Sequence, residues 1–134
     1  MKRLIALSAT LVGLLALPAS AHHSLSPYVM STYRTIDGTV KSFEFANPHA
    51  RLALLVPGAN GSSTLWDFEG GSIGRMMTGG FTKDTIRVGD KITVSYSPRR
   101  NNSIGGFFLA VRTEDGTTYA IDRFKQLKRT QPPS

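Results

Sequence analysis

Short runs in which apolar and polar residues alternate follow one another along this chain from residue 33 onward, and turn-forming residues separate them. Alternation with a period of two indicates half-buried β-strands, because successive side chains of a strand point to opposite faces. The strongest turn signal is Asn60-Gly61, a pair that favours tight hairpins. This pattern restricts the chain to a small all-β fold.

The order of these runs predicts the architecture. Six strands are expected, over residues 33–45, 51–56, 63–69, 92–96, 106–113 and 117–122. Between the third and the fourth, Gly70-Gly71 ends a strand, Ser72 is suited to cap a helix over residues 73–78, and Gly79-Gly80 ends that helix. This is the order of an OB-like barrel of five to six strands, in which the short helix plugs the barrel between strands three and four. An open β-sandwich is the alternative.

The first strand contains a change of face. Val40 belongs to one alternating set, whereas Phe43 and Phe45 belong to the other. Because a regular strand cannot bury both sets on one face, we expect a β-bulge near Lys41-Ser42 that redirects the side chains.

The first 21 residues have the composition of a secretory signal peptide. A basic start, Met1-Lys2-Arg3, precedes an apolar run from Leu4 to Leu17, and small residues follow up to Ala21. The apolar run is shorter than the roughly 20 residues that a membrane-spanning helix needs. We therefore expect an exported protein, periplasmic or secreted, with no transmembrane segment after processing. The sequence has no cysteine, which excludes a lipidated cysteine and a disulfide.

The remaining chain has the size of one domain. We expect an N-terminal arm over residues 22–35, a β-barrel domain over residues 36–122 and a basic, flexible tail over residues 123–134. Removal of Lys2 and Arg3 with the signal peptide lowers the formal net charge by two, from +7 to +5. Part of this excess lies in the tail, which is typical of a solvated chain end or, alternatively, of contact with an anionic envelope surface.

Several sequence blocks resemble one known family. They are Ala21-His22-His23-Ser24, Gly38-Thr39-Val40 with Phe43-Glu44-Phe45, Asn47-Pro48-His49-Ala50, Trp66 with Glu69-Gly70-Gly71-Ser72, Gly80-Phe81-Thr82-Lys83-Asp84 and Gly89-Asp90-Lys91-Ile92-Thr93-Val94. Together they resemble the DUF6152 family of small exported bacterial proteins, mostly of unassigned function, over nearly the whole mature chain. The resemblance implies export and supplies no activity.

The three histidines suggest a metal site. Cleavage after Ala21 makes His22 the first residue, whose free amine and imidazole can chelate one ion. Such nitrogen ligands suit Cu(II), with Zn(II) less favoured. His23 can add an imidazole, and His49, which follows Asn47-Pro48, can add another if the fold brings it near. The alternative is that the His-His pair is only a polar start to the mature chain and that His49 caps a turn.

A second hypothesis is a groove for a ligand other than a metal. Tyr96, Arg99, Arg100 and Phe108 lie in the fourth and fifth strands and the loop between them, and can form a basic surface with aromatic side chains. OB barrels bind nucleic acid through such surfaces. Export disfavours nucleic acid and favours an anionic component of the cell envelope or a periplasmic protein as the partner.

Enzyme chemistry is disfavoured. Glu44, Asp67 and Glu69 are carboxylates on strands and are expected to face solvent rather than to form a catalytic pair. Ser72 lacks the Gly-x-Ser-x-Gly context of a hydrolase nucleophile. We therefore expect a binding protein without catalytic residues.

Overall fold

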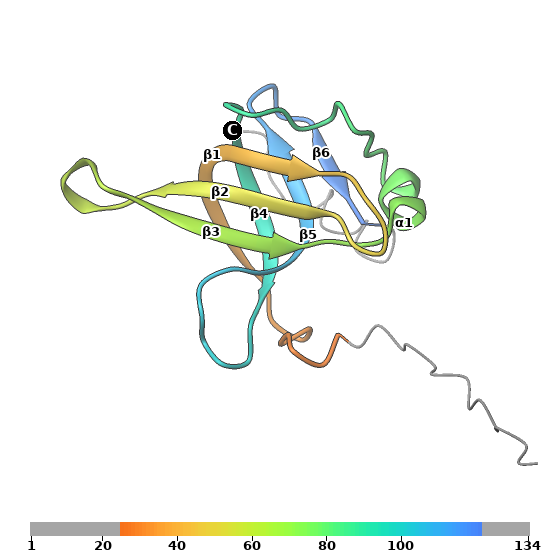
Figure 1. The fold of residues 1–134 in the computed structure, drawn as a ribbon, viewed down its shortest axis with the longest axis horizontal. Helices are drawn as coiled ribbons and strands as arrows, with labels where there is room; N and C mark the ends of the chain where they lie inside the picture. Colours follow the sequence, from red (N-terminus) through yellow and green to blue (C-terminus); the bar gives the residue numbers. More distant parts are fainter. Residues whose placement is uncertain (1–24, 122–134) are drawn as a thin grey trace, which may run out of the picture.

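A computed structural model of the 134-residue chain describes residues 25–121 (Figure 1). The strands and the helix follow one another in the expected order. They are β1 (Arg34–Glu44), β2 (Arg51–Pro57), a 3₁₀ turn (Ala59–Gly61), β3 (Ser63–Glu69), α1 (Ile73–Thr78), β4 (Lys91–Pro98), β5 (Gly106–Thr113) and β6 (Thr118–Ala120). The predicted bounds of β3, β5 and α1 agree with the structure, whereas β6 is shorter than predicted.

The strands pair into a closed ring. Their order in the sheet is β3-β2-β1-β4-β5-β6, and a further pairing joins β3 to β5. Phe68 and Glu69 of β3 run parallel to Gly106 and Phe107 of β5, and this contact closes the ring. β6 is added to β5 as an antiparallel neighbour. The predicted OB-like arrangement, with the helix between the third and fourth strands, is therefore confirmed in preference to the open sandwich.

The core fills the inside of this ring. Alternate residues of β1, β2 and β4 point inward, so Val40, Leu54 and Val94 are buried. The helix α1 contributes Met76, which is also buried. β5 is buried from Gly106 to Val111 because both of its alternating sets of side chains are covered. Phe108 packs against Phe81, whereas Phe107 packs against Tyr28 of the arm.

The predicted bulge is present in β1. The pairing of β1 with β2 shifts register between Val40 and Ser42. Val40 consequently lies in the core, whereas Phe43 and Phe45 pack against the core from the other alternating set, with ring centroids 6.0 Å apart. The extra residue changes which face of the strand is directed inward, as a bulge does.

The β2–β3 hairpin extends beyond the ring (Figure 1). β1 accompanies β2 only as far as Leu55, and β5 accompanies β3 only at Phe68 and Glu69. At the tip, Asn60 and Gly61 have positive φ angles of 58° and 73°, a conformation that glycine and asparagine adopt most readily. The hairpin turn predicted at this pair is confirmed.

The described part of the N-terminal arm is docked on the ring. Tyr28 is buried, and its ring centroid lies 5.6 Å from that of Phe107. The N–H of Val29 donates to the carbonyl of Pro98 (2.9 Å), and Tyr28 forms an antiparallel bridge with Arg99. The predicted signal peptide and basic tail lie outside the described residues. Within residues 25–121, no helix is long and apolar enough to cross a membrane.

Candidate functional site

Two blocks that are distant in the sequence lie side by side in the structure. The corner that contains Asn47-Pro48, whose peptide bond is cis, joins β1 to β2, and Gly70-Gly71 follows β3. The N–H of Gly70 donates to the carbonyl of Ala50 (2.8 Å), and the N–H of Ala50 donates to the carbonyl of Gly71 (2.9 Å). These backbone bonds fix the corner against the end of β3.

The same corner supplies the cap of the helix α1. The side-chain oxygen of Asn47 accepts a hydrogen bond from the N–H of Ile73 at 3.1 Å. Ser72 occupies the predicted N-cap position, but its side chain makes no capping hydrogen bond. Asn47 therefore satisfies one of the amides that a helix leaves unpaired at its start.

Three polar side chains from three segments converge beside this corner. Nδ1 of His49 contacts Oε1 of Glu69, and the hydroxyl of Tyr28 donates to Oε2 of Glu69 at 2.6 Å. The His49 and Glu69 side chains are both partly buried. Because one carboxylate group accepts from the arm and contacts the corner, the positions of Tyr28 and His49 are linked through Glu69.

The environment of Tyr28 keeps its hydroxyl protonated. Burial raises the pKa of Tyr28 above its ordinary value of 10.0, and the nearby Arg99 opposes this shift without reversing it. At neutral pH the phenol is therefore a hydrogen-bond donor, which is the role that the Glu69 carboxylate requires.

A hollow of about 250 Å³ lies next to these side chains on the outer face of β1, β2 and β3. Its lining combines two small residues, two apolar core residues and five charged residues, namely Ser42, Ala53, Leu52, Phe68, Glu44, Arg51, Asp67, Glu69 and Arg99. Ser42 and Ala53 are cross-strand neighbours. Since both are small, the longer charged side chains around them form the walls of the hollow.

The two predicted groove arginines have structural partners. Nη2 of Arg99 forms an ion pair with Oδ2 of Asp67 at 2.5 Å, and Nη1 of Arg99 donates to the carbonyl of Ile104. Nε of Arg100 donates to the carbonyl of Ser26 at 2.6 Å. Arg99 lines the hollow, whereas Arg100 fastens the arm to the loop between β4 and β5.

The two predicted groove aromatics lie in the core instead of on a groove wall. Tyr96 is 5% exposed, and its ring contacts that of Phe68 at a centroid distance of 5.2 Å. Phe108 is fully buried and packs against Phe81. The prediction of an aromatic binding surface is therefore wrong. Tyr96 and Phe108 pack against other aromatic side chains of the core, so neither presents its ring to solvent.

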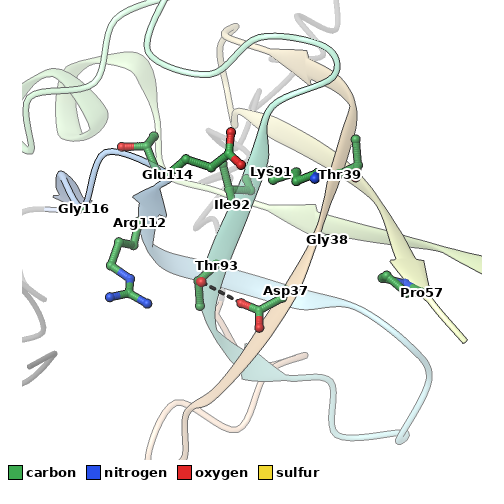
Figure 2. Close-up of a pocket in the computed structure, with 11 residues that line it drawn as sticks. Asp37, Gly38, Thr39, Pro57, Lys91, Ile92, Thr93, Arg112, Glu114 and Gly116 are labelled. Carbon is green, nitrogen blue, oxygen red and sulfur yellow. Dashed lines mark hydrogen bonds between the residues drawn. The ribbon is translucent and has the colours of Figure 1, made fainter. Parts of the chain in front are cut away.

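A second hollow, of about 330 Å³, lies over β1, β4 and β5, and Figure 2 shows its lining. Its charged side chains have both signs, with Asp37 and Glu114 facing the same space as Lys91 and Arg112. The carboxylate of Asp37 accepts from the hydroxyl of Thr93 at 2.6 Å. Two of the sequence blocks, around Gly38-Thr39 and Lys91 to Thr93, contribute to its lining, but the hollow contains none of the predicted site residues.

The structure places only one of the three predicted metal ligands. His22 and His23 lie outside the described residues, so their proximity to His49 stays a prediction. Within residues 25–121, no group of three or more histidine, cysteine, aspartate or glutamate side chains is arranged to hold an ion. His49 and Glu69 would thus need ligands from elsewhere to complete a metal site.

Sequence reasoning missed Glu69 as the partner of His49. Both residues belong to the blocks that carry the family resemblance, and this shared membership is the one sequence signal that could have linked them. The strand pattern instead predicts that Glu69 faces solvent, because a charged residue at the end of a strand usually faces water. The docking of the arm through Tyr28 gives this carboxylate two partners.

Comparison with known proteins gives one match. A family model, DUF6152, described as a family of unknown function, matches residues 10–113. No curated protein and no solved structure matches the chain.

Proposed function

Because the chain belongs to the DUF6152 family, whose function is unknown, we propose that it is an exported binding protein, not an enzyme, that holds Cu(II) or a similar divalent metal. The proposed ligands are His49 and the processed N-terminal His22, with His23 as a further nitrogen ligand. The observation that carries this proposal is the contact between Nδ1 of His49 and the carboxylate of Glu69.

This contact has the geometry that metal-binding histidines use. A ligating imidazole usually donates its other ring N–H to a carboxylate, which fixes the tautomer and the ring orientation. With the proton of the neutral ring on Nδ1 beside Glu69, the lone pair of His49 is on Nε2, the form in which imidazole binds a metal. Tyr28 holds the other oxygen of Glu69, so the carboxylate itself is oriented.

The docking of the arm supports a role for the N-terminal histidines. The N–H of Tyr28 donates to the carbonyl of Leu25 at 3.0 Å, and Leu25 packs against the core. Consecutive Cα atoms are 3.8 Å apart, so the Cα of His22 is within about 11 Å of the Cα of Leu25. Tyr28 itself reaches Glu69. The covalent chain therefore limits the distance of the N-terminal ligands from the docked part of the arm, and we propose that they reach the His49 corner within this limit.

The chemistry of the ligand set favours copper. A free amine and imidazole nitrogens bind Cu(II) more tightly than the other divalent first-row metals, with Zn(II) next among the candidates proposed here. The carboxylates near the site serve other purposes, because Glu69 contacts His49 and Tyr28, and Asp67 pairs with Arg99. This distribution supports binding rather than acid–base catalysis.

Titration of the mature chain, beginning at His22, with Cu(II) tests the proposal. We expect stoichiometric binding that His49→Ala, His22→Ala or an additional N-terminal methionine weakens at least about tenfold. Circular dichroism of each variant controls for folding. Equal affinity in the parent protein and in the variants would refute the site.

A non-metal ligand, such as an anionic envelope component or a protein partner, is the second candidate. Arg51 and Arg99 at the hollow on β1, β2 and β3 favour it. The ion pair between Arg99 and Asp67 disfavours it, because the guanidinium already has an anionic partner. Loss of function in Arg51→Ala with unchanged copper affinity would select this candidate.

A further inference from the structure

The outer edge of β3 has a free stretch. β3 pairs with β2 along its whole length, from Ser63 to Glu69. On its other side it pairs with β5 only at Phe68 and Glu69. In the part of the chain that the structure describes, no strand lies beside Ser63, Leu65 or their neighbours on this side, because the hairpin projects past the ring (Figure 1).

The direction of the backbone groups along β3 follows from two hydrogen bonds at the ends of the hairpin. The N–H of Gly58 donates to the carbonyl of Ser62, and the N–H of Gly70 donates to the carbonyl of Ala50, both at 2.8 Å. The register between β2 and β3 is continuous from one end to the other. Since backbone groups in a strand alternate in direction, even-numbered residues of β3 bond to β2 and odd-numbered residues point away from it.

The odd-numbered residues therefore present the free edge. The N–H and C=O of Ser63 and Leu65 point outward, and so does the N–H of Asp67. The carbonyl of Asp67 has a neighbour already, because Nη2 of Arg99 lies 3.4 Å from it. The side chain of Leu65 is 52% exposed on the same stretch.

Among the described residues 25–121, this edge lacks the usual protection against strand addition. Natural edge strands are commonly blunted by proline, lysine, a bulge or a covering loop. Ser63–Trp66 contains no proline and no charge, and its pairing with β2 has no register shift. Asp67 is the nearest charged residue, and it lies where Arg99 begins to cover the edge.

We propose that the free edge of β3 pairs antiparallel with the same edge of a second copy of this chain, about a two-fold axis at Leu65. This register is self-complementary. The two Leu65 residues exchange N–H···O=C bonds, and the N–H of Asp67 in each copy donates to the carbonyl of Ser63 in the other. The exposed Leu65 side chains then contact each other on one face of the joined sheet.

The distribution of charge also favours a second copy of the chain as the partner of this edge. In the proposed register each Asp67 faces Ser63 of the other copy, so no like charges are opposed across the pair. The formal net charge of the mature chain, +5 after Lys2 and Arg3 are subtracted from +7, makes two copies repel each other over most approaches, but Ser63–Trp66 carries none of that charge. The contact is small, which predicts a dimer that forms reversibly with concentration.

The dimer is tested by sedimentation of the mature chain over a concentration series. We expect a monomer–dimer equilibrium whose dissociation constant rises at least about tenfold in Leu65→Pro and Leu65→Lys. Proline at position 65 removes an outward N–H that the β2 ladder does not use. Met77→Lys is the matched control, because Met77 is 61% exposed on α1 and the substitution adds the same charge elsewhere.

Disulfide trapping gives a second and independent readout. The chain has no cysteine, so Leu65→Cys introduces a single thiol on the proposed axis. Directly opposed residues of a hydrogen-bonded antiparallel pair have Cα atoms about 5.5 Å apart, a separation that a disulfide spans. We expect rapid covalent dimerisation of Leu65→Cys under mild oxidation, and slow dimerisation of the control Met77→Cys, whose position is at least as exposed.

The two experiments decide the proposal together. A parent protein that is monomeric at every concentration would overturn the proposed dimer. The remaining candidate partner of the edge would then be an extended segment of another protein. A dimer that persists in Leu65→Pro, or equal rates of cross-linking at positions 65 and 77, would also overturn it. Selective loss and selective cross-linking at Leu65 support it.

Discussion

Glu69 connects the arm, the corner and the ring through a single carboxylate group. Tyr28 donates to one of its oxygens, and His49 contacts the other. His49 could be singled out from the sequence because histidine is rare here and follows a rigid Asn-Pro pair. Its partner could not, because the residue opposite a loop side chain depends on how the arm and the end of β3 pack.

Replacement of Glu69 by glutamine tests its role as a positioning residue for the proposed metal ligand. Glutamine keeps the size of the side chain but loses the charge that faces Nδ1 of His49. We expect Cu(II) affinity to fall roughly ten- to hundredfold, the usual effect of removing a partner behind a metal-binding histidine. Calorimetric titration measures the change.

Glu44→Gln is the control, since Glu44 lines the same hollow as Glu69 and the substitution removes the same charge. The affinity of the Glu44→Gln variant for Cu(II) should equal that of the parent protein. Equal affinity in Glu69→Gln as well would mean that the carboxylate does not orient a metal ligand.

Tyr28→Phe isolates the hydroxyl that docks the arm. Phenylalanine preserves the packing on Phe107, so near neutral pH we expect a loss of about 1–3 kcal/mol in the free energy of unfolding, the contribution of a hydrogen bond to a charged group. The pKa of Tyr28 is raised in the folded protein, so its contribution is complete below the ordinary value of 10.0. The contribution is lost as the pH rises through the folded-state pKa.

Urea unfolding of both proteins from about pH 8 to about pH 11 measures this dependence. The difference in stability between the parent protein and Tyr28→Phe should shrink above pH 10. A difference that stays constant over this range would show that the phenol does not titrate as its buried position requires.

At the scale of elements, Gly70 determines how closely β3 can approach β5. A Cβ atom at position 70 would lie 2.4 Å from the ring of Phe108, closer than two carbon atoms can pack. The absence of a side chain therefore allows Phe108 to fill the core beneath the end of β3. From the sequence, Gly70-Gly71 predicts the end of a strand and belongs to a block of the family resemblance, but neither signal indicates this close packing on Phe108.

Gly70→Ala should lower the free energy of unfolding by about 1–3 kcal/mol, because the added methyl group overpacks the core. Gly74→Ala is the matched control in α1, where an added Cβ has no atom within 4 Å. It should be neutral or stabilising by up to about 1 kcal/mol, since alanine favours a helix. Urea midpoints distinguish the two, and equal effects would contradict the close packing at Phe108.

The elements themselves were largely predictable, for local reasons. Alternation located β3 and β4, paired glycines delimited α1, and the shift between Val40 and Phe43 revealed the bulge. The burial of Tyr96 and Phe108 was not predictable in this way. It depends on contacts with Phe68 and Phe81, which are distant in the sequence and which no local pattern specifies.

At the scale of the whole molecule, the ring depends on a short parallel contact between β3 and β5. The order of strands and helix suggested this closure through the known OB arrangement, but no local pattern specifies the pairing of Phe68 with Gly106. Closure also leaves the β2–β3 hairpin outside the ring, which creates the free edge of β3 (Figure 1). The proposed dimer is therefore a consequence of topology rather than of a sequence motif.

The proposed metal site is likewise a property of the whole chain, because it combines a loop histidine with the processed N-terminus. Pulsed electron paramagnetic resonance of the mature protein loaded with one equivalent of Cu(II) tests this combination most directly, since it detects coordinated imidazole rings. The predicted result is imidazole coordination that loses one ring in His49→Ala and another in His22→Ala. Identical spectra for the parent protein and His49→Ala would contradict the proposal that the corner of the barrel binds the metal.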